Sequence, residues 1–513
     1  MLTTILILLC LCVAALLVAH VVFRPPPLTG RSVSTTIPAS DRTALGRTVR
    51  AAAAGGPHDS GVTPLLTGLD ALGARIAVIR AAEETLDLQY YIWQRDATGL
   101  TLLTELRAAA DRGVRIRLLL DDNGIAGLDA DLAALNTLPT VEVRLFNPFI
   151  LRRPKSLGYA FDFLRLNRRM HNKSLTADGA VTILGGRNIG DIYFSFGAGP
   201  HYLDTDVLAV GAVAADAGAD FDGYWASGSA YPAELILSDA PGGLERTQAD
   251  ANRLTAGPAW AAHLDAVRSA PLMERLARGG EIVEWAPVTL MSDDPAKGLG
   301  KVRNRDLLYA QLMRLMAAPG RSVDIVSAYF VPGRRLTERL ARLAREGRRV
   351  RVLTNSQEAT DVLVVHSAYV KYRPALLQGG VTLFEMRATA GTPREPRVPG
   401  ASTRASLHSK TVTIDGELIF IGSFNLDPRS VMLNTEMGVL IESRRVAALV
   451  NEGLDRVLPT LSYGPVLDER GRIVWQQPAG DDPVLIHKTE PGTNLAERVF
   501  LWLLGRLPIE WLL

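Results

Sequence analysis

A nine-residue motif occurs twice in this chain, and the repetition limits the folds that the chain can adopt. The two copies, His171–Gly179 and His408–Gly416, both read H-x-K-x4-D-G. Each copy continues through a short apolar run to a pair of small residues and then to an asparagine, Asn188 or Asn425, at the same distance from its histidine. Matched spacing over this length indicates that a structural unit has been duplicated.

The repeat extends upstream of the motif. Leu86–Ile92 and Val323–Tyr329 are similar apolar segments, and each precedes its histidine by the same number of residues. Between these landmarks, Leu102–Leu120 and Leu336–Leu353 each contain an amphipathic helical run, a glycine and a short apolar strand. Alternation of helical and strand patterns indicates an α/β unit with a largely parallel sheet. The sequence therefore predicts a duplicated α/β domain.

A length of 513 residues exceeds what one hydrophobic core usually organises, so two domains with flanking segments are expected. The predicted division is a transmembrane anchor or signal segment over 1–24, a linker over 25–63, a first repeat over 64–220, a helical connector over 221–300, a second repeat over 301–455 and a C-terminal tail over 456–513. The formal net charge of +2 indicates no particular class of partner. Both cysteines, Cys10 and Cys12, lie in the first segment, which leaves the folded part without a disulfide or a Cys-based metal site.

The first segment, Met1–Phe23, carries no charged side chain and is long enough to span a bilayer as a helix. Arg24 and three prolines end it. The alternative is a cleaved signal peptide, but the segment lacks a basic start and a clear small-x-small cleavage site. We therefore expect a retained anchor. Arginines that follow it favour a cytoplasmic body, and the side of the membrane stays open.

Three further stretches have open interpretations. Asn147–Met170 is rich in Arg and aromatic residues, which fits either a solvated basic loop or an anion-attracting mouth. The matching stretch, Ala388–Ser406, is predicted to be a loop at the same mouth. The end of the chain, Glu497–Leu513, contains Trp, Leu and Phe together with Arg498 and Arg506. It fits either a helix packed on the body or a segment lying among lipid headgroups.

The repeated motif places cationic groups on one surface. In a strand, positions i and i+2 point to the same face, so His171 and Lys173 project together, as do His408 and Lys410. One copy alone offers a nucleophile without an acid for the leaving group. Two copies that face each other supply both, which suits exchange at a phosphodiester by covalent catalysis. The lysines and asparagines would neutralise the phosphoryl oxygens, so no metal is expected.

The candidate site residues follow from these roles. The candidate catalytic residues are His171, Lys173, Asp178, His408, Lys410 and Asp415; the candidate phosphate-binding residues are Asn188, Asn425, Ser423 and Gly186; the residues expected to orient the histidines are Asp206 and Glu436. Each aspartate of the motif precedes a glycine, so a turn-capping or lysine-orienting role competes with chemistry. Ser423 either touches phosphate or satisfies a turn. His366 fits a helix histidine or a headgroup contact, and His201 and His263 are expected on the surface.

The paired motifs resemble the HKD motifs of the phospholipase D superfamily. The match to the superfamily continues through Gly185–Asp191 and Gly422–Ser430. The flanking sequence, including Leu86–Trp93 and Leu507–Leu513, resembles the bacterial cardiolipin synthase C type. The resemblance implies two α/β/α lobes with one shared active site. It also implies transfer of a phosphatidyl group, through a phosphohistidine, onto the glycerol hydroxyl of phosphatidylglycerol. Family practice makes His171 the nucleophile and His408 the acid and base, although the sequence alone does not rank them.

The resemblance also sets the expected partners and the alternatives. Phospholipids, phosphatidylglycerol or phosphatidylethanolamine, are the expected substrates, with no cofactor, at the inner membrane of a bacterial cell. The rival functions are a phospholipase D that uses water as acceptor, a membrane-anchored nuclease and an adaptor without turnover. Nucleic acid is disfavoured because no continuous basic groove with stacking aromatics is evident. The oligomeric state stays open, because the duplication already supplies the pairing of two motifs.

Overall fold

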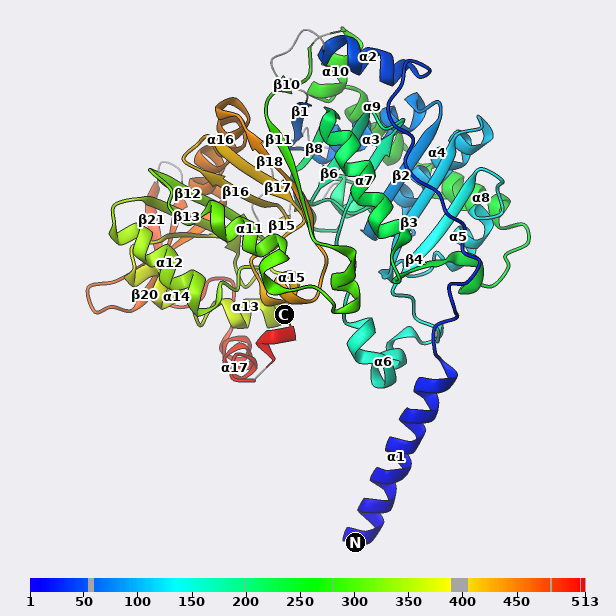
Figure 1. The fold of residues 1–513 in the computed structure, drawn as a ribbon. Coiled ribbons are helices and arrows are strands. Elements are labelled where there is room, and N and C mark those ends of the chain that lie inside the picture. Colours follow the sequence, from blue (N-terminus) through cyan, green and yellow to red (C-terminus); the bar gives the residue numbers. More distant parts are fainter. Residues whose placement is uncertain are drawn as a thin grey trace.

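The structure is a computed structural model that describes residues 1–53, 60–197, 199–279, 281–388, 405–479, 482–507 and 509–512. Figure 1 shows two lobes side by side, each built on a twisted sheet with helices against it, and one helix, α1 (Leu2–Val22), that projects away from the body. The predicted fold class, a duplicated α/β domain with an N-terminal hydrophobic helix, is confirmed.

The first lobe contains a nine-stranded sheet in the order β10-β1-β8-β6-β5-β2-β3-β4-β9. Only β2, β3 and β4 run parallel to one another, and the remaining pairs are antiparallel. The strands are β1 (Ser60–Leu65), β2 (Thr85–Ile92), β3 (Arg115–Gly124), β4 (Val141–Phe146), β5 (Ser174–Ala177), β6 (Val181–Gly185), β8 (Asp206–Gly211), β9 (Ala230–Pro232) and β10 (Glu284–Trp285).

The second lobe repeats this plan in a ten-stranded sheet, β11-β18-β17-β16-β12-β13-β14-β19-β20-β21, in which β12, β13 and β14 are the parallel neighbours. The strands are β11 (Val288–Ser292), β12 (Ser322–Ser327), β13 (Arg349–Asn355), β14 (Thr382–Met386), β16 (Lys410–Ile414), β17 (Leu418–Gly422), β18 (Met437–Glu442), β19 (Ser462–Leu467), β20 (Ile473–Ala479) and β21 (Asp482–His487). The expectation of a largely parallel sheet is wrong in both lobes, because each motif forms an antiparallel hairpin, β5–β6 or β16–β17.

Helices cover the sheets. They are α2 (Ala44–Ala53), α3 (Gly68–Ala81), α4 (Ala97–Asp111), α5 (Asp129–Leu135), α6 (Gly158–Leu166), α7 (Ala212–Ala226), α8 (Gly243–Thr255), α9 (Pro258–Arg268), α10 (Pro271–Ala277), α11 (Leu308–Leu315), α12 (Gly333–Arg345), α13 (Leu363–Tyr369), α14 (Arg373–Gln378), α15 (Pro428–Met432), α16 (Arg444–Leu461) and α17 (Leu495–Leu504). Two large apolar cores, one in each lobe, lie between these helices and the sheets.

The lobes meet through their motif hairpins. A third apolar cluster joins side chains of β6 and β8, such as Leu184 and Val207, to side chains of β17 and β18, such as Ile421 and Val439. A short two-stranded sheet also crosses the boundary, because β7 (His201–Leu203) of the first lobe pairs in parallel with β15 (Ala405–Leu407) of the second. Burial of apolar surface along this boundary fixes the two motifs relative to each other.

The described part of the segment expected to be a linker, 25–53 and 60–63, lies along the first lobe (Figure 1). Arg31 donates to the carbonyl oxygens of Ala226 and Ser227, and the backbone N–H of Thr36 donates to the carboxylate of Asp222. These contacts involve polar side chains and backbone groups, which leave no hydrophobic period in the sequence. The segment's last residues belong to β1 of the first sheet.

The connector and the tail also contribute strands. Residues 221–300 include the expected helices, α8, α9 and α10, but β9 and β10 complete the first sheet and β11 begins the second. In the tail, β19, β20 and β21 extend the second sheet, and α17 packs against α13 with Leu501 buried. The stretch expected to form a loop at the same mouth as Asn147–Met170, Ala388–Ser406, lies mostly outside the described residues.

Candidate active site

The backbone of each motif histidine is paired with the opposite lobe. His171 N–H donates to the carbonyl oxygen of Thr435 over 2.9 Å, and His408 N–H donates to the carbonyl oxygen of Leu203 over 2.8 Å. Met170 and Thr435 form an isolated parallel bridge next to the first of these bonds. The two histidines are therefore positioned by equivalent, reciprocal contacts across the lobe boundary.

Each imidazole also meets a carboxylate from the opposite lobe. His171 Nδ1 lies 2.8 Å from Glu436 Oε2, and His408 Nδ1 lies 2.5 Å from Asp204 Oδ2. Both carboxylates are fully buried. A carboxylate on Nδ1 fixes the tautomer in which Nε2 carries the lone pair, which leaves Nε2 as the reactive nitrogen of each ring.

The residue that orients His408 is Asp204 and not Asp206, which corrects the sequence prediction. The carboxylate of Asp206 accepts from Arg75 Nη2 over 2.9 Å and from Arg187 N–H over 3.0 Å, both within the first lobe. The sequence alone does not identify the orienting acid, because Asp204-Thr205-Asp206 contains two aspartates. The backbone register decides between them. His171 N–H bonds to the carbonyl of Thr435, and the next residue is Glu436. His408 N–H bonds to the carbonyl of Leu203, and the next residue is Asp204.

Burial sets the protonation of both histidines. It lowers the pKa of His171 well below its ordinary value of 6.5, and the positive charges of Lys173, Lys410 and His408 add to the effect. Burial and Lys410 also lower the pKa of His408, but Asp204 acts in the opposite direction. For Asp204, burial raises the pKa, and the charge and hydrogen bond of His408 outweigh it, so that the net pKa is lowered. Of the two rings, His408 has the stronger support for a proton.

Glu436 has a different environment from Asp204. Burial raises its pKa to about 7, against the opposing charge of Lys173. Ser423 Oγ donates to Glu436 Oε2 over 2.5 Å, so this hydroxyl, a candidate phosphate ligand, contacts the orienting acid. Asp293 Oδ2 accepts the N–H of Glu436 and also pairs with Lys297 Nζ at 2.7 Å. Asp293 and Lys297 lie outside the repeat, and no repeated pattern in the sequence singles them out.

The two lysines lie beside the histidines. Lys173 Nζ donates to the carbonyl oxygen of His171 over 2.5 Å, and Lys410 Nζ donates to that of His408. Burial lowers the pKa of each lysine, and the charge of Lys410 lowers that of Lys173 further. Two cations held together in a dry site favour an anionic ligand, because a phosphate oxygen relieves both the desolvation and the mutual repulsion.

The motif aspartates cap backbone groups instead of facing the histidines. The carboxylate of Asp178 accepts the N–H groups of Glu83, Glu84 and Thr85, where β2 begins. The carboxylate of Asp415 accepts the corresponding three N–H groups, of Gly320, Arg321 and Ser322, where β12 begins. Both aspartates have positive φ, 50° and 57°, as the hairpin turn requires. Of the two interpretations of these residues, the geometry fits turn capping.

The motif asparagines occupy equivalent positions. Asn188 Oδ1 accepts the N–H of Ile92 over 3.1 Å, and Asn425 Oδ1 accepts that of Tyr329 over 3.4 Å. Asn188 Nδ2 also donates to Tyr193 Oη over 3.0 Å. These bonds tie the asparagines to the ends of β2 and β12, so the amide of Asn188 is already engaged in the protein. Both Asn188 and Asn425 are buried.

Gly186 makes room for the orienting acid. A Cβ atom at this position would lie 2.1 Å from Asp204 Oδ1, and the neighbouring atoms of the same carboxylate are also closer than any side chain tolerates. The structure therefore gives Gly186 a steric role beside Asp204, and its contact with phosphate stays a prediction.

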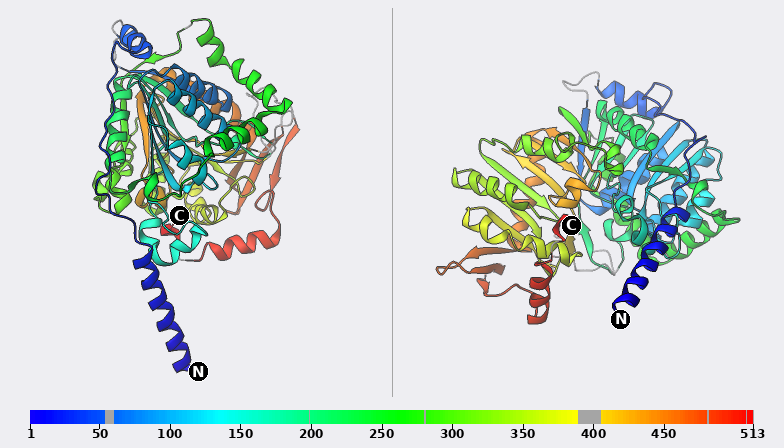
Figure 2. Two further views of the ribbon diagram at one scale, coloured as in Figure 1. Left: turned by 90° about the vertical axis from the view of Figure 1, so that its right-hand side faces the viewer. Right: turned by 60° about the horizontal axis from the view of Figure 1, so that its bottom comes forward.

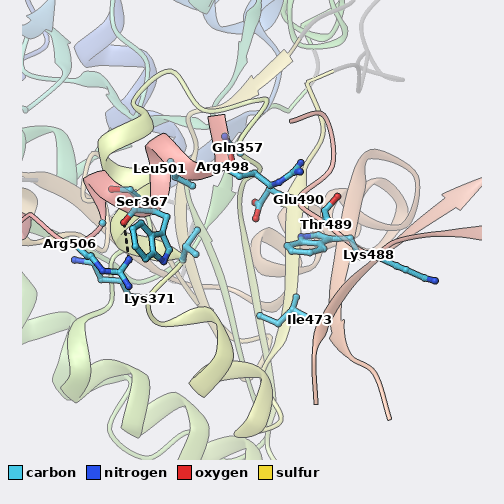
Figure 3. A pocket seen from close by; sticks show the side chains of 14 residues that line it. Gln357, Ser367, Lys371, Ile473, Lys488, Thr489, Glu490, Arg498, Leu501 and Arg506 are labelled. Carbon is cyan, nitrogen blue, oxygen red and sulfur yellow. Dashed lines mark hydrogen bonds between the residues drawn. The ribbon is translucent and has the colours of Figure 1, made fainter. Parts of the chain in front are cut away.

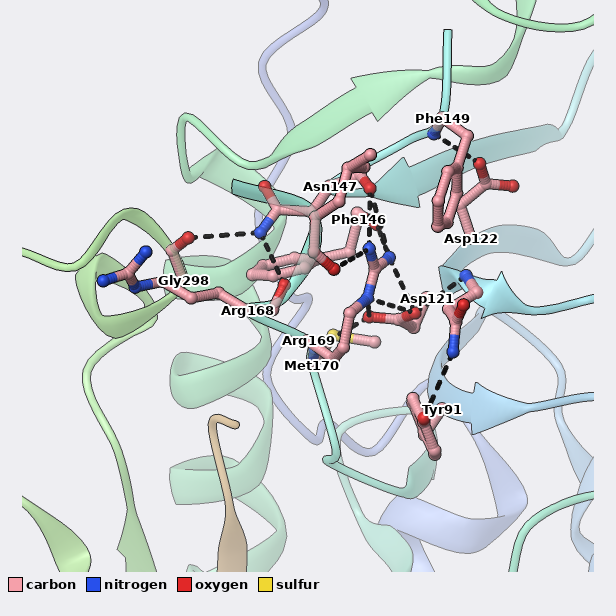
Figure 4. A network of polar contacts seen from close by, with 12 residues as sticks. Tyr91, Asp121, Asp122, Phe146, Asn147, Phe149, Arg168, Arg169, Met170 and Gly298 are labelled. Atoms are coloured by element: carbon pink, nitrogen blue, oxygen red, sulfur yellow. Dashed lines mark hydrogen bonds and ion pairs between the residues drawn. The ribbon is translucent and has the colours of Figure 1, made fainter. Parts of the chain in front are cut away.

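A buried ion pair supports the segment before β5 that carries His171 (Figure 4). The guanidinium of Arg169 lies against Asp121, with Nε 2.9 Å from Oδ1, and donates to the carbonyl oxygens of Phe146 and Asn147. Asp121 Oδ2 also accepts the N–H of Met170 over 2.8 Å. This network fixes the backbone immediately before His171.

Several cations of the basic stretch before the first motif are paired with aspartates of the first lobe. Arg169 is paired with Asp121, and Arg152 and Lys155 both contact the buried carboxylate of Asp122. Aromatic rings lie closer to the chemistry: Tyr91 lies edge-on to the ring of His171 at 4.9 Å, and its ring centre lies 5.4 Å from Lys173 Nζ.

Tyr193 and Tyr202 contact the other histidine. The ring centroids lie 5.3 Å and 5.1 Å from that of His408. Tyr202 Oη donates to Asp361, and Tyr329 Oη donates to the same carboxylate. None of these tyrosines lies within either motif, so the motif alone does not reveal them.

His366, His201 and His263 pack within the protein, outside the paired motifs. His366 lies in α13, as the helix interpretation predicts, and its Nε2 lies 3.1 Å from Glu490 Oε1. The expectation that His201 and His263 lie on the surface is wrong. His201 begins β7 and is buried, and the fully buried His263 packs against the rings of Trp260 and Phe196.

Comparisons with known proteins agree with this geometry. A family model described as "Cardiolipin synthase, PLD-like domain" matches residues 76–196 and 312–458, one segment in each lobe. Cardiolipin synthase C of Escherichia coli K12 is 45% identical over 468 residues, which cover 89% of this chain and 97% of that protein. Cardiolipin synthase B of the same organism is 28% identical over 382 residues, 74% of this chain and 76% of its own length. The crystal structure of phosphatidylserine synthase from Haemophilus influenzae Rd KW20 has the same fold, with a TM-score of 0.57 and 16% identity over 91% of this chain and 99% of that one.

Proposed function

Since the chain belongs to the family of cardiolipin synthases with phospholipase D-like domains, we propose that it transfers a phosphatidyl group between phospholipids through a phosphohistidine. The observation that carries this proposal is the reciprocal geometry of His171 and His408, each held by a carboxylate of the opposite lobe. Such an arrangement provides one nucleophile and one proton donor at a single site.

His171 is the nucleophile in this proposal. Its pKa is lowered well below 6.5, chiefly by burial, so the ring is neutral and Nε2 has its lone pair at neutral pH. Nε2 attacks phosphorus, and the bond from phosphorus to the leaving alcohol's oxygen breaks. The products of this half-reaction are the phosphatidyl–histidine and the departing alcohol, which is glycerol when phosphatidylglycerol is the donor.

His408 acts as acid and then as base. Its partner Asp204 carries a lowered pKa and stays anionic, which stabilises the imidazolium form of His408. The protonated ring gives its proton to the departing alkoxide. The neutral ring then takes the proton of the acceptor hydroxyl, whose oxygen attacks phosphorus and breaks the bond to His171 Nε2. Both rings return to their initial states.

Lys173 and Lys410 stabilise the charge on the phosphoryl oxygens. Both ammonium groups are buried, and no residue of either motif apart from the aspartates carries negative charge. In a water-excluded site such cations act more strongly than in solvent. Because the orienting groups and the cations come from both lobes, neither lobe alone is expected to be active.

We propose phosphatidylglycerol as both donor and acceptor, with cardiolipin as product, and the inner membrane of a bacterial cell as the location. The support is the similarity to the two cardiolipin synthases and the exposed apolar helix α1, the one helix in the described part of the chain that is long and apolar enough to cross a bilayer. Phosphatidylethanolamine is the alternative co-substrate, because its phosphodiester has the same reacting group.

Vesicles of phosphatidylglycerol incubated with the full chain in membranes, with chelator present, test this function by thin-layer chromatography. We expect cardiolipin and glycerol from the unmodified chain and neither from His171→Ala or His408→Ala. His487→Ala, a histidine of β21 bonded to Gln477, is the matched control and should remain active. If phosphatidic acid were the only product, water would be the acceptor, and the protein would be a phospholipase D instead of a transferase. Full activity in either motif variant would contradict the shared site.

A further inference from the structure

A groove of about 670 Å³ lies against α17, away from the paired motifs. Its walls come from the C-terminal end of α13, from α17 and from β20 and the residues after β21. None of the described residues that line this groove, the α17 groove, belongs to either motif. Its volume falls in the range that binds a ligand the size of a lipid headgroup with its adjoining carbons.

Four cationic side chains line the α17 groove: Lys371, Lys488, Arg498 and Arg506. Figure 3 shows Lys371 and Arg506 toward one end and Lys488 toward the other. Lys371 Nζ contacts Glu510 at 3.2 Å. Among the described residues the other three pair with no carboxylate: Arg498 donates to Thr493, and Arg506 lies over the ring of Trp502 at 3.2 Å.

The acidic residue in the lining does not cancel these charges. Both carboxylate oxygens of Glu490 accept hydrogen bonds from the protein interior. Arg373 Nη1 donates to Oε2 over 2.8 Å and Arg373 Nη2 donates to Oε1 over 2.9 Å, and His366 Nε2 lies 3.1 Å from Oε1. Arg373 and His366 are both buried. The carboxylate is therefore neutralised within the protein, and the groove presents a net positive surface to a ligand.

Part of the remaining lining is apolar and suits an acyl chain. It includes Val370, Ile473, Trp475, Leu501 and Trp502. Positive charge next to an apolar wall matches an amphiphile with a phosphate at one end and hydrocarbon at the other. A soluble anion would leave this apolar wall exposed to water.

Helix α17, which lines the groove, lies at the end of the molecule where α1 leaves it (Figures 1 and 2). Phe23, just after α1, stacks on Phe161 of α6 at 5.4 Å. Arg429 Nη1 then links the two lobes at this end, since it donates to Asn167 Oδ1, directly after α6, and to the carbonyl oxygen of Leu512.

The outer surface of this end is apolar. Its exposed large hydrophobic residues are Leu157, Phe163 and Leu164 around α6, and Leu495, Val499, Phe500, Trp502, Leu503, Leu507 and Trp511 in and after α17. A bilayer that surrounds α1 would bring its headgroups to this surface and to the α17 groove.

We propose that the α17 groove binds one anionic phospholipid of the membrane in which α1 is inserted, separately from the site of the paired histidines. Lys488, Arg498 and Arg506, which are spread along the groove, attract the anionic headgroup, and the first part of an acyl chain lies along Trp475 and Leu501. The bound lipid holds α17 at the headgroup level and so fixes the height of the second lobe above the bilayer. This inference does not depend on the reaction proposed above.

Photo-crosslinking of the full chain in vesicles tests the proposal. The probe is phosphatidylglycerol with a diazirine near the start of one acyl chain, in a phosphatidylcholine bilayer, and a phosphatidylcholine probe of the same structure gives the background. Digestion and mass spectrometry locate the labelled peptides. We expect the phosphatidylglycerol probe to label the segments around 473–475 and 495–506 well above that background. Lys488→Glu/Arg498→Glu/Arg506→Glu should lower this labelling at least about tenfold, because each cation near an anionic lipid contributes several-fold in affinity.

The matched control reverses three exposed arginines elsewhere, Arg275→Glu/Arg335→Glu/Arg345→Glu, with the same change in net charge. In this control variant, the phosphatidylglycerol probe should label the α17 groove as strongly as in the unmodified chain. Labelling of peptides that carry the motifs reports on the active site and should persist in both variants. If the groove triple variant fails to fold, Lys488→Glu/Arg506→Glu, at two exposed positions, carries the same expectation. Equal labelling by the two probes, or undiminished labelling in the groove variants, would overturn the proposal.

Discussion

At each histidine the identity of the orienting acid decides how the ring behaves. Asp204 is anionic beside His408, whereas burial raises the pKa of Glu436 beside His171 to about 7. Two rings in equivalent positions therefore differ in their affinity for a proton. This difference in proton affinity makes one histidine the nucleophile and the other the acid, although both motifs contain the same His, Lys and Asp.

Asp204→Asn and Asp206→Asn should fail in different ways. Loss of the Asp204 charge removes the support of protonated His408 and should lower kcat on the order of 10³–10⁴-fold while the fold persists. Asp206→Asn leaves Arg75 buried without its carboxylate, which should cost about 3–5 kcal/mol of stability. Activity assays and thermal unfolding of both variants provide the measurement. A normally stable Asp206→Asn protein with the larger loss of kcat would return the orienting role to Asp206.

The pH dependence follows from the lowered pKa values. The productive free enzyme has neutral His171 and protonated His408, and both pKa values lie below 6.5, chiefly because of burial. As pH rises through the lowered pKa of His408, which lies below 6.5, the ring loses its proton and kcat/KM should fall. A bound phosphodiester anion raises the pKa of His408, so the alkaline limb of kcat should lie at higher pH than that of kcat/KM. Coincident alkaline limbs would contradict this coupling.

At the scale of the elements, the repeated Asp-Gly turn joins the hairpin to the neighbouring strand. Asp178→Asn should lower the free energy of unfolding by about 1–3 kcal/mol, because it weakens three bonds to backbone N–H groups at the start of β2. Asp415→Asn should cost less, since Asp415 is partly exposed and Asp178 is buried. Urea midpoints measure both effects. An unchanged midpoint together with a large loss of kcat would assign the aspartates to the chemistry.

The repeat was sufficient to predict the duplicated fold, because matched spacing between strands and motifs survives in the sequence. It did not reveal the mixed sheet order or the strands β9, β10 and β11 inside the connector, which are short and have little period of their own. It also placed the orienting acid at Asp206, two residues too far along. The correct register depends on a hydrogen bond between lobes, and no property of the local sequence encodes that pairing.

The sequence also did not predict the ion pairs and the aromatic packing in the first lobe. Arg152, Lys155 and Arg169 appear as a basic cluster in the sequence, yet each is paired with an aspartate in the second half of β3, Asp121 or Asp122. His263 appears as an isolated polar residue but lies among aromatic rings. Contacts between residues far apart in the chain decide both cases.

At the scale of the whole molecule, α1 and the apolar surface beside it should act as two separate attachments. The chain without residues 1–24 should still bind vesicles that contain phosphatidylglycerol, but high salt should release it, because α6 and α17 only touch the interface. The full chain should stay in the membrane pellet under the same salt wash. Sedimentation of both proteins measures this. A truncated chain that resists salt, or a full chain that washes off, would exclude α1 as the anchor.

The account depends most on two lobes that share one site, with His171 as nucleophile and His408 as acid and base. A phosphatidyl ester of p-nitrophenol tests this directly, because its leaving group needs no proton. In His408→Ala the first half-reaction should proceed and its product should accumulate, since no base activates the acceptor. Mass spectrometry of the quenched protein should then find a phosphatidyl group on His171, and none on His171→Ala. A phosphatidyl group on His408 in the His171→Ala protein would contradict the assignment.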